Sequence, residues 1–150
     1  MKIVMKFVLP FLAVLCLAAP AASLGQDLPP DSWDGVYISK IEIHDYDTIK
    51  VTLENSNTYA KGLRDWRVRL SRYGDSVGSV DLGRIKGDNS RTFSIDWNGD
   101  EFNQIQLIPA DGALVGSAVP GGMIWEPDAY ARIEKQENGI WEWVVHPPRN

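Results

Sequence analysis

Short runs of alternating apolar and polar residues, each closed by a turn, constrain the fold of this chain most strongly. The last third shows the pattern best, because Asp111-Gly112 and Asn138-Gly139 each separate two strand-like runs. Asp-Gly and Asn-Gly pairs favour the tight turns of β-hairpins, since these turns need residues that tolerate a positive φ. We therefore predict two β-hairpins in this part of the chain.

Alternation also marks the earlier part of the chain. In the run 66–73, Trp66, Val68 and Leu70 share one phase, as the buried face of a strand requires. No window of adequate length carries the apolar stripe of a helix. About nine short strands separated by turn residues are typical of an all-β sandwich or barrel. The expected strands are 36–44, 48–53, 66–73, 79–82, 92–95, 102–107, 114–118, 130–134 and 140–145.

The N-terminal 25 residues have the layout of an export signal. Lys2 and Lys6 precede an apolar run over 7–19, and small residues follow it. The run is shorter than the roughly 20 residues of a membrane span, although an uncleaved anchor is the alternative. We expect a secreted or periplasmic protein with a signal at 1–25, a linker at 26–34, one domain at 35–150 and no span after cleavage. Cys16, the only cysteine, would leave with the signal, so packing alone must hold the domain.

The charge of the chain disfavours several classes of partner. The full chain has 15 basic and 20 acidic residues, and removal of the two signal lysines leaves 13 against 20, a formal charge of −7. An acidic domain lacks the electrostatic footprint for nucleic acid and for anionic membranes. The arginines at 64, 67, 69 and 72 are the local exception, and we interpret them as an outer strand face paired with acidic neighbours.

Few residues offer catalytic or metal-binding chemistry. The two histidines are His44, which lies beside acidic residues on the outward phase of its run, and His146 near the C-terminus. The sequence lacks the Gly-x-Ser-x-Gly elbow that would place a serine nucleophile. Asp96, Asn98 and Asp100 resemble part of a calcium loop, but the full ligand spacing and the distal glutamate are absent. They remain weak metal candidates, and we expect no resident cofactor.

The six tryptophans fall into two groups. Three lie in strand-like runs and are expected in the core: Trp66, Trp141 and Trp143. The other three lie in or near loops, where aromatic side chains can anchor a partner or a carbohydrate or can cap the ends of a sandwich. These weak binding candidates are Trp33, Trp97 and Trp125.

The order of four segments resembles the lamin tail domain, an immunoglobulin-like module that also occurs in exported bacterial proteins. The segments are the opening strand at 36–41, the Leu-x-x-Trp-x-Val run at 63–68, the strand, Asp-Gly turn and strand at 104–115, and the final hairpin at 129–143. The resemblance implies an immunoglobulin-like β-sandwich of about eight or nine short strands. It also implies that Trp66 is the core tryptophan and that Trp141 and Trp143 pack the last strand. Arg132 would be an inward or edge arginine that ties the final hairpin to the sandwich.

Two functions remain open at this point. The resemblance implies a non-enzymatic interaction or scaffolding module of the cell envelope, whose partner is a protein or another envelope component. The alternative is a small exported hydrolase or a calcium-dependent carbohydrate-binding domain that uses His44, Asp96, Asn98 and Asp100. The second function requires these polar groups to converge on one concave site.

Overall fold

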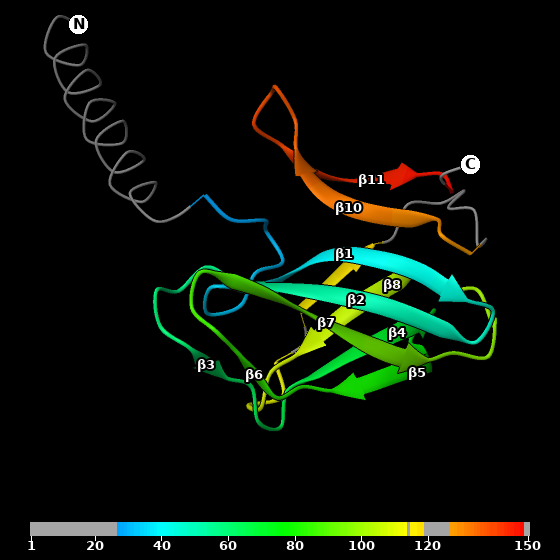
Figure 1. The fold of residues 1–150 in the computed structure, drawn as a ribbon, viewed down its shortest axis with the longest axis horizontal. Coiled ribbons are helices and arrows are strands. Elements are labelled where there is room, and N and C mark those ends of the chain that lie inside the picture. Colours follow the sequence, from blue (N-terminus) through cyan, green and yellow to red (C-terminus); the bar gives the residue numbers. More distant parts are fainter. Residues whose placement is uncertain (1–26, 114, 119–126, 149–150) are drawn as a thin grey trace, which may run out of the picture.

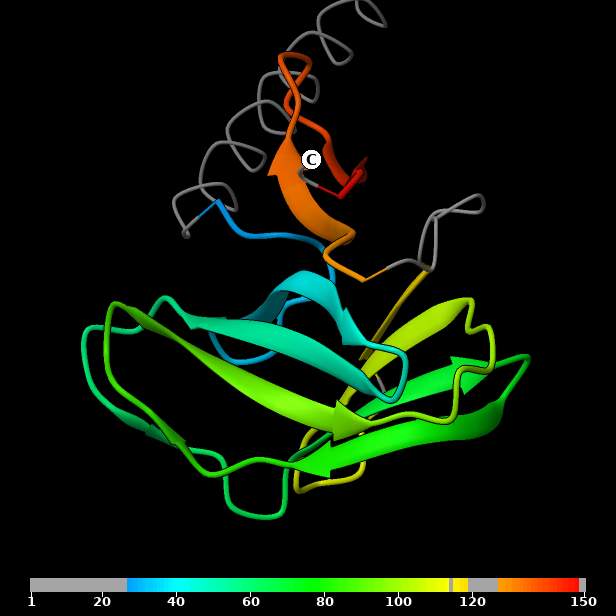
Figure 2. The same ribbon diagram turned by 45° about the vertical axis from the view of Figure 1, so that its right-hand side comes forward.

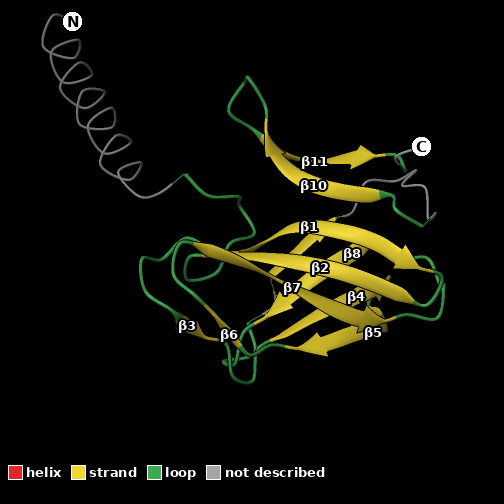
Figure 3. Ribbon diagram, in the orientation of Figure 1, coloured by secondary structure: helices red, strands yellow, loops and turns green. Residues whose placement is uncertain are grey.

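The computed structural model describes residues 27–113, 115–118 and 127–148. The expected export signal (1–25), Leu114 and Trp125 lie outside this part of the chain. The described residues form strands and loops, with no helix among them (Figure 3). The strands are β1 (Val36–Asp45), β2 (Thr48–Asn55), β3 (Lys61–Gly62), β4 (Arg67–Arg72), β5 (Asp75–Asp81), β6 (Arg84–Ile85), β7 (Asn89–Asp96), β8 (Gln104–Ile108), β9 (Val115–Ala118), β10 (Tyr130–Lys135) and β11 (Trp141–His146).

These strands form antiparallel sheets that pack together as a sandwich-like fold, which confirms the all-β prediction. One sheet has the order β11-β10-β1-β2-β7 and the other β5-β4-β8-β9, while β3 and β6 make a small separate ribbon (Figure 1). Figure 2 shows the two larger sheets as facing layers. Each of the nine expected runs overlaps a strand. The strands β3 and β6 were not expected, because two residues are too few to show a period.

The inner face of the five-stranded sheet is mainly aliphatic. Along β2 the side chains alternate between buried and half-buried, so Ile49, Val51 and Leu53 all enter the core. On β1, Ile38 and Ile41 are both buried although they are three positions apart, a spacing that strict alternation would place on opposite faces. A bulge between Ile38 and Lys40 shifts the phase by one residue and restores the alternation. The same bulge turns Lys40 to the outer face.

The facing sheet contributes the other half of the core. Val68 and Leu70 of β4 are fully buried, as the alternation predicted. Trp66 is only 7% exposed and lies just before β4, so its expected place in the core is confirmed. Backbone bonds hold the residue there: its N–H donates to the Leu63 carbonyl at 3.1 Å, and its own carbonyl accepts from the Leu82 N–H at 2.9 Å.

Both expected hairpins in the last third form. β8 pairs with β9 across the Asp111-Gly112 turn, and β10 pairs with β11 across the Asn138-Gly139 turn. Gly112 and Gly139 each have a φ of 82°, the left-handed region that glycine adopts without strain. The turn after β4 begins one residue inside the strand expected at 66–73. It uses the two positive-φ residues Tyr73 and Gly74, so Asp75 and the residue after it already belong to β5.

Candidate functional site

The acidic loop after β7 is built around a buried indole. Trp97 is 6% exposed and packs edge-on against Phe102, with ring centroids 6.3 Å apart. Its indole N–H donates to the Asp100 carbonyl at 2.6 Å, and its backbone N–H donates to the Asp47 carbonyl at 2.8 Å. The structure therefore places Trp97 in the core, where it closes one end of the sandwich, and not on the surface where a partner could contact it.

The weak metal candidates in this loop mainly bind one another. The Asn98 side-chain amide donates to an Asp100 carboxylate oxygen at 2.9 Å, and the Asp100 N–H donates to the Asn98 side-chain oxygen at 3.0 Å. Such bonds stabilise a turn without any ion. Within the described ranges no three acidic, histidine or cysteine side chains are grouped to hold a metal. Asp96 and Asn98 share a shallow depression with Asp47, to which Asp100 does not contribute.

His44 lies apart from that loop. It is exposed near the end of β1, on the outward phase that the sequence indicated. The register aligns its neighbour Asp45 with Thr48 of β2, which in turn aligns with Asp96 of β7. Two strand spacings, roughly 10 Å, therefore separate the β1 and β7 positions. His44 does not line the depression beside Asp96, so the polar groups of the hydrolase or calcium hypothesis do not converge.

Three further tryptophans of the described ranges support the structure in different ways. Trp33 is half-buried against the core and pairs with Val36 through its backbone. Trp143 packs against the core from β11, as expected. Trp141 was expected in the core but is half-buried outside it, because its indole N–H donates to Asp27 at 3.3 Å. Asp27 also forms an ion pair with Lys135. The hydrogen bonds from Lys135 and then from Trp141 hold the pKa of the Asp27 carboxyl below its usual range.

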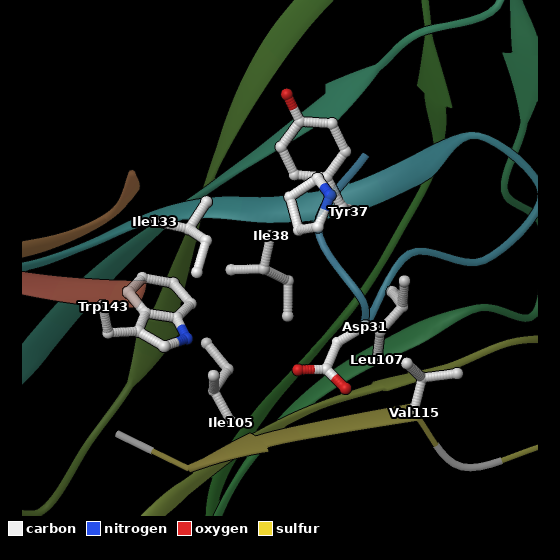
Figure 4. Close-up of a pocket in the computed structure, with 9 residues that line it drawn as sticks. Asp31, Tyr37, Ile38, Ile105, Leu107, Val115, Ile133 and Trp143 are labelled. Carbon is white, nitrogen blue, oxygen red and sulfur yellow. The ribbon is translucent and has the colours of Figure 1, made fainter. Parts of the chain in front are cut away.

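A small cavity lies between the sheets where residues 29–31 cross the structure. Its walls are largely apolar, and the Trp143 indole nitrogen and the Asp31 carboxylate point toward it (Figure 4). The Trp143 N–H is buried and has no hydrogen-bond partner among the described residues. The volume is about 10 Å³, enough for roughly one water. The cavity is thus too small for a substrate.

A cluster of charged and aromatic side chains lies on the outer face of β1 and β10. Lys40 aligns directly with Arg132, and Glu42 aligns with Tyr130. The Lys40 ammonium lies 3.0 Å from Glu42 and 4.6 Å from the centre of the Tyr130 ring. His146 of β11 stacks on Tyr130, with centroids 4.6 Å apart and ring planes 13° apart. We call Lys40, Glu42, Tyr130 and Arg132 the β1–β10 cluster.

Two open depressions flank this cluster. Lys40 and Arg132 line both of them. One, of about 360 Å³, also includes Glu42, Asp128 and Tyr130. The other, of about 440 Å³, extends toward β2 and β7 and has several hydroxyl groups: Tyr37, Ser39, Lys40, Thr52, Glu54, Ser90, Arg132 and Ile133 line it. Burial, followed by the nearby Glu54 carboxylate, raises the pKa of the Tyr37 hydroxyl.

Arg132 lies neither inward nor on an edge strand, the two places that the family resemblance implied. It is exposed on β10, which lies between β1 and β11, and its alignment with Lys40 does connect the final hairpin to the rest of the sheet. By contrast, Arg67 pairs with Asp81 of the neighbouring strand at 2.9 Å, as expected for an outer strand face.

The sequence did not single out Lys40, Glu42 or Tyr130. These residues meet only through a strand pairing across about ninety residues.

Comparison with known proteins does not identify a relative. No family model matches the chain, and no curated protein or solved structure is significantly similar to it. Within the part of the chain that the structure describes, no helix has the length and apolar character needed to cross a membrane. Function is therefore inferred from the chain's own residues.

Proposed function

We propose that this chain is an exported, non-enzymatic β-sandwich module that binds a partner in the cell envelope. The N-terminal signal pattern supports export, and the order of the strand segments supports an immunoglobulin-like fold of the lamin tail type. Binding on the surface of a rigid sheet needs no enclosed cavity. The β1–β10 cluster and its two depressions are the part of the described surface that best fits such a role.

The observation that carries this proposal is the separation in space of the side chains that could act in hydrolysis or bind calcium. A hydrolytic site needs a base within hydrogen-bond reach of a nucleophile, and a calcium site needs several oxygen ligands around one point. His44 lies two strands away from Asp96, and Asn98 and Asp100 bind one another. The depression beside Asp96 is shallow. These facts favour the interaction module over the hydrolase or calcium-dependent binder.

Enzymatic turnover is the first test. The full chain is incubated with chromogenic esters and glycosides, alongside His44→Ala and a matched surface variant, Asp88→Ala. We expect no turnover above buffer for any of the three proteins. Turnover that disappears only in the His44 variant would overturn the proposal in favour of the hydrolase.

A calcium titration of the same protein should give a flat heat trace, whereas saturable heat lost in Asp96→Asn would favour the cation-dependent alternative.

Export is the second test. The full chain with a C-terminal tag is expressed in its host, and the mass of the recovered protein is measured in each cell fraction. We expect a product that lacks about the first 25 residues and lies outside the cytoplasm. Full-length protein confined to the cytoplasm would contradict the proposed location.

A further inference from the structure

The alignment of Lys40 with Arg132 places two positive charges directly opposite one another on neighbouring strands. Like charges in this position destabilise a sheet, so the arrangement does not serve stability. Glu42 lies beside Lys40 at 3.0 Å, whereas Arg132 forms no ion pair with any described residue. An arginine side chain offers a planar fork of donors that matches a carboxylate. The pair is therefore suited to hold an anionic group from outside the domain.

The Lys40 ammonium is held in position before any ligand arrives. It rests over the Tyr130 ring, which stacks on the His146 ring. The His146 ring nitrogen is in turn 2.9 Å from the Glu134 carboxylate. The Lys40 side chain is only 26% exposed. Because these contacts restrict the side chain, binding an anion costs little further ordering.

The rest of the larger depression indicates which kind of anion fits. Ser39, Thr52 and Ser90 present hydroxyl groups, and Glu54 presents a carboxylate that accepts a bond from Ser39 at 3.2 Å. Hydroxyls both donate and accept, and carboxylates accept bonds from hydroxyl groups. An acidic peptide would bring carboxylates but no hydroxyl groups to this lining. A sugar ring with one carboxylate and several hydroxyls would satisfy both parts of the lining.

We infer that the outer face of β1 and β10 binds carboxylate-bearing saccharides, with Arg132 and Lys40 holding the carboxylate and the hydroxyl-lined depression holding the ring. This inference rests on the proposed binding function and specifies its ligand. Two cations against one carboxylate line the larger depression, so the local charge is positive within an acidic chain. This local positive charge explains how a chain that is acidic overall can bind an anionic ligand.

The test is calorimetric titration of the full chain with trigalacturonate at low salt. We expect saturable binding that weakens as salt is added, and much weaker binding of the fully methyl-esterified trisaccharide. Arg132→Gln and Lys40→Gln should each weaken binding about tenfold or more, because each removes a hydrogen bond to a charged group. Lys50→Gln is the matched control, since it removes a positive charge from the neighbouring strand outside both depressions, and its affinity should be unchanged.

Each other outcome overturns the inference. Absence of binding, equal binding of the ester, or equal loss in the Lys50 variant would show that the pair does not recognise a carboxylate. Equal binding of a triaspartate peptide would show that the ligand class is wrong. Circular dichroism of each variant confirms that it is folded. None of these results bears on turnover or export, so failure here is distinguishable from failure of the proposed function.

Discussion

The two faces of the five-stranded sheet follow different physical rules. The inner face of β1 and β2 carries fully buried aliphatic side chains such as Ile41 and Val51. The outer face at the same level carries Lys40 and Arg132, two like charges in direct alignment. Burial of apolar surface explains why the inner side chains are aliphatic. It does not explain why two like charges are aligned on the outer face, where they destabilise the sheet. The comparison separates what stabilises the fold from what is available for binding.

Truncation of an inner side chain should have the largest effect. Ile41→Ala removes a fully buried side chain, so we expect the free energy of unfolding to fall by about 2–5 kcal/mol. Its outward neighbour offers the matched control: Glu42→Ala loses only a partly exposed ion pair and should cost less than about 1 kcal/mol. Urea unfolding followed by tryptophan fluorescence measures both. Equal losses at the two positions would contradict the division between the faces.

A polar residue on the inner phase should rank next. Asn55 is buried at the end of β2, and its amide donates to the carbonyls of Tyr59, Ile85 and Lys86 at 3.1–3.3 Å. Asn55→Ala would leave buried acceptors without a donor, so we expect a loss of about 1–3 kcal/mol. Ser90→Ala, on an exposed site of the adjacent strand, should stay within about 0.5 kcal/mol. Thermal unfolding and urea unfolding should both give this order. If Asn55→Ala left the stability unchanged, the inner face would tolerate unpaired polar groups and the expectation would be wrong.

Substitution in the outer pair should change stability slightly and in the opposite direction. Arg132→Gln removes one of two aligned positive charges, so we expect the free energy of unfolding to rise by no more than about 1 kcal/mol. The gain should shrink as salt is added, because exposed charges are screened. A loss of several kcal/mol on urea unfolding would mean that Arg132 is a structural residue and would remove the basis for a binding role.

The smallest expected effect is on the pH dependence of stability, through Tyr37 at the margin of the larger depression. The pKa of Tyr37 is raised by burial and by Glu54, so the folded state holds this proton to a higher pH than the unfolded state does. Its contribution to stability is complete below the unfolded pKa and is lost as the pH rises through the folded pKa. Tyr37→Phe should therefore flatten the alkaline decline in stability. An unchanged alkaline slope in that variant would indicate that Tyr37 titrates as if it were exposed.

Local pattern was sufficient to predict most of the fold. Alternation predicted that Ile49, Val51 and Leu53 face inward, and Asn138-Gly139 predicted the final hairpin, because both signals act over a few residues. The β3–β6 ribbon and the bulge at Ile38 were not predictable. A two-residue strand has no period, and a bulge depends on the partner strand.

The candidate site could not be predicted for a different reason. Sequence pattern directed attention to Asp96–Asp100, where polar residues are close in the chain, but these groups bind one another. Lys40 and Arg132 are far apart in the chain and become neighbours only through the pairing of β1 with β10. Such a pairing reflects the topology of the whole sheet, which no local signal encodes.

The most direct test of the division between the two faces is a residue-resolved binding experiment. Amide chemical shifts of the full chain are recorded by NMR while trigalacturonate is added. The perturbations should centre on the outer-face residues around Lys40 and Arg132 and should be absent from the loop around Asp96. Perturbations confined to that loop, or no perturbation of the β1 and β10 amides at saturating ligand, would contradict the account.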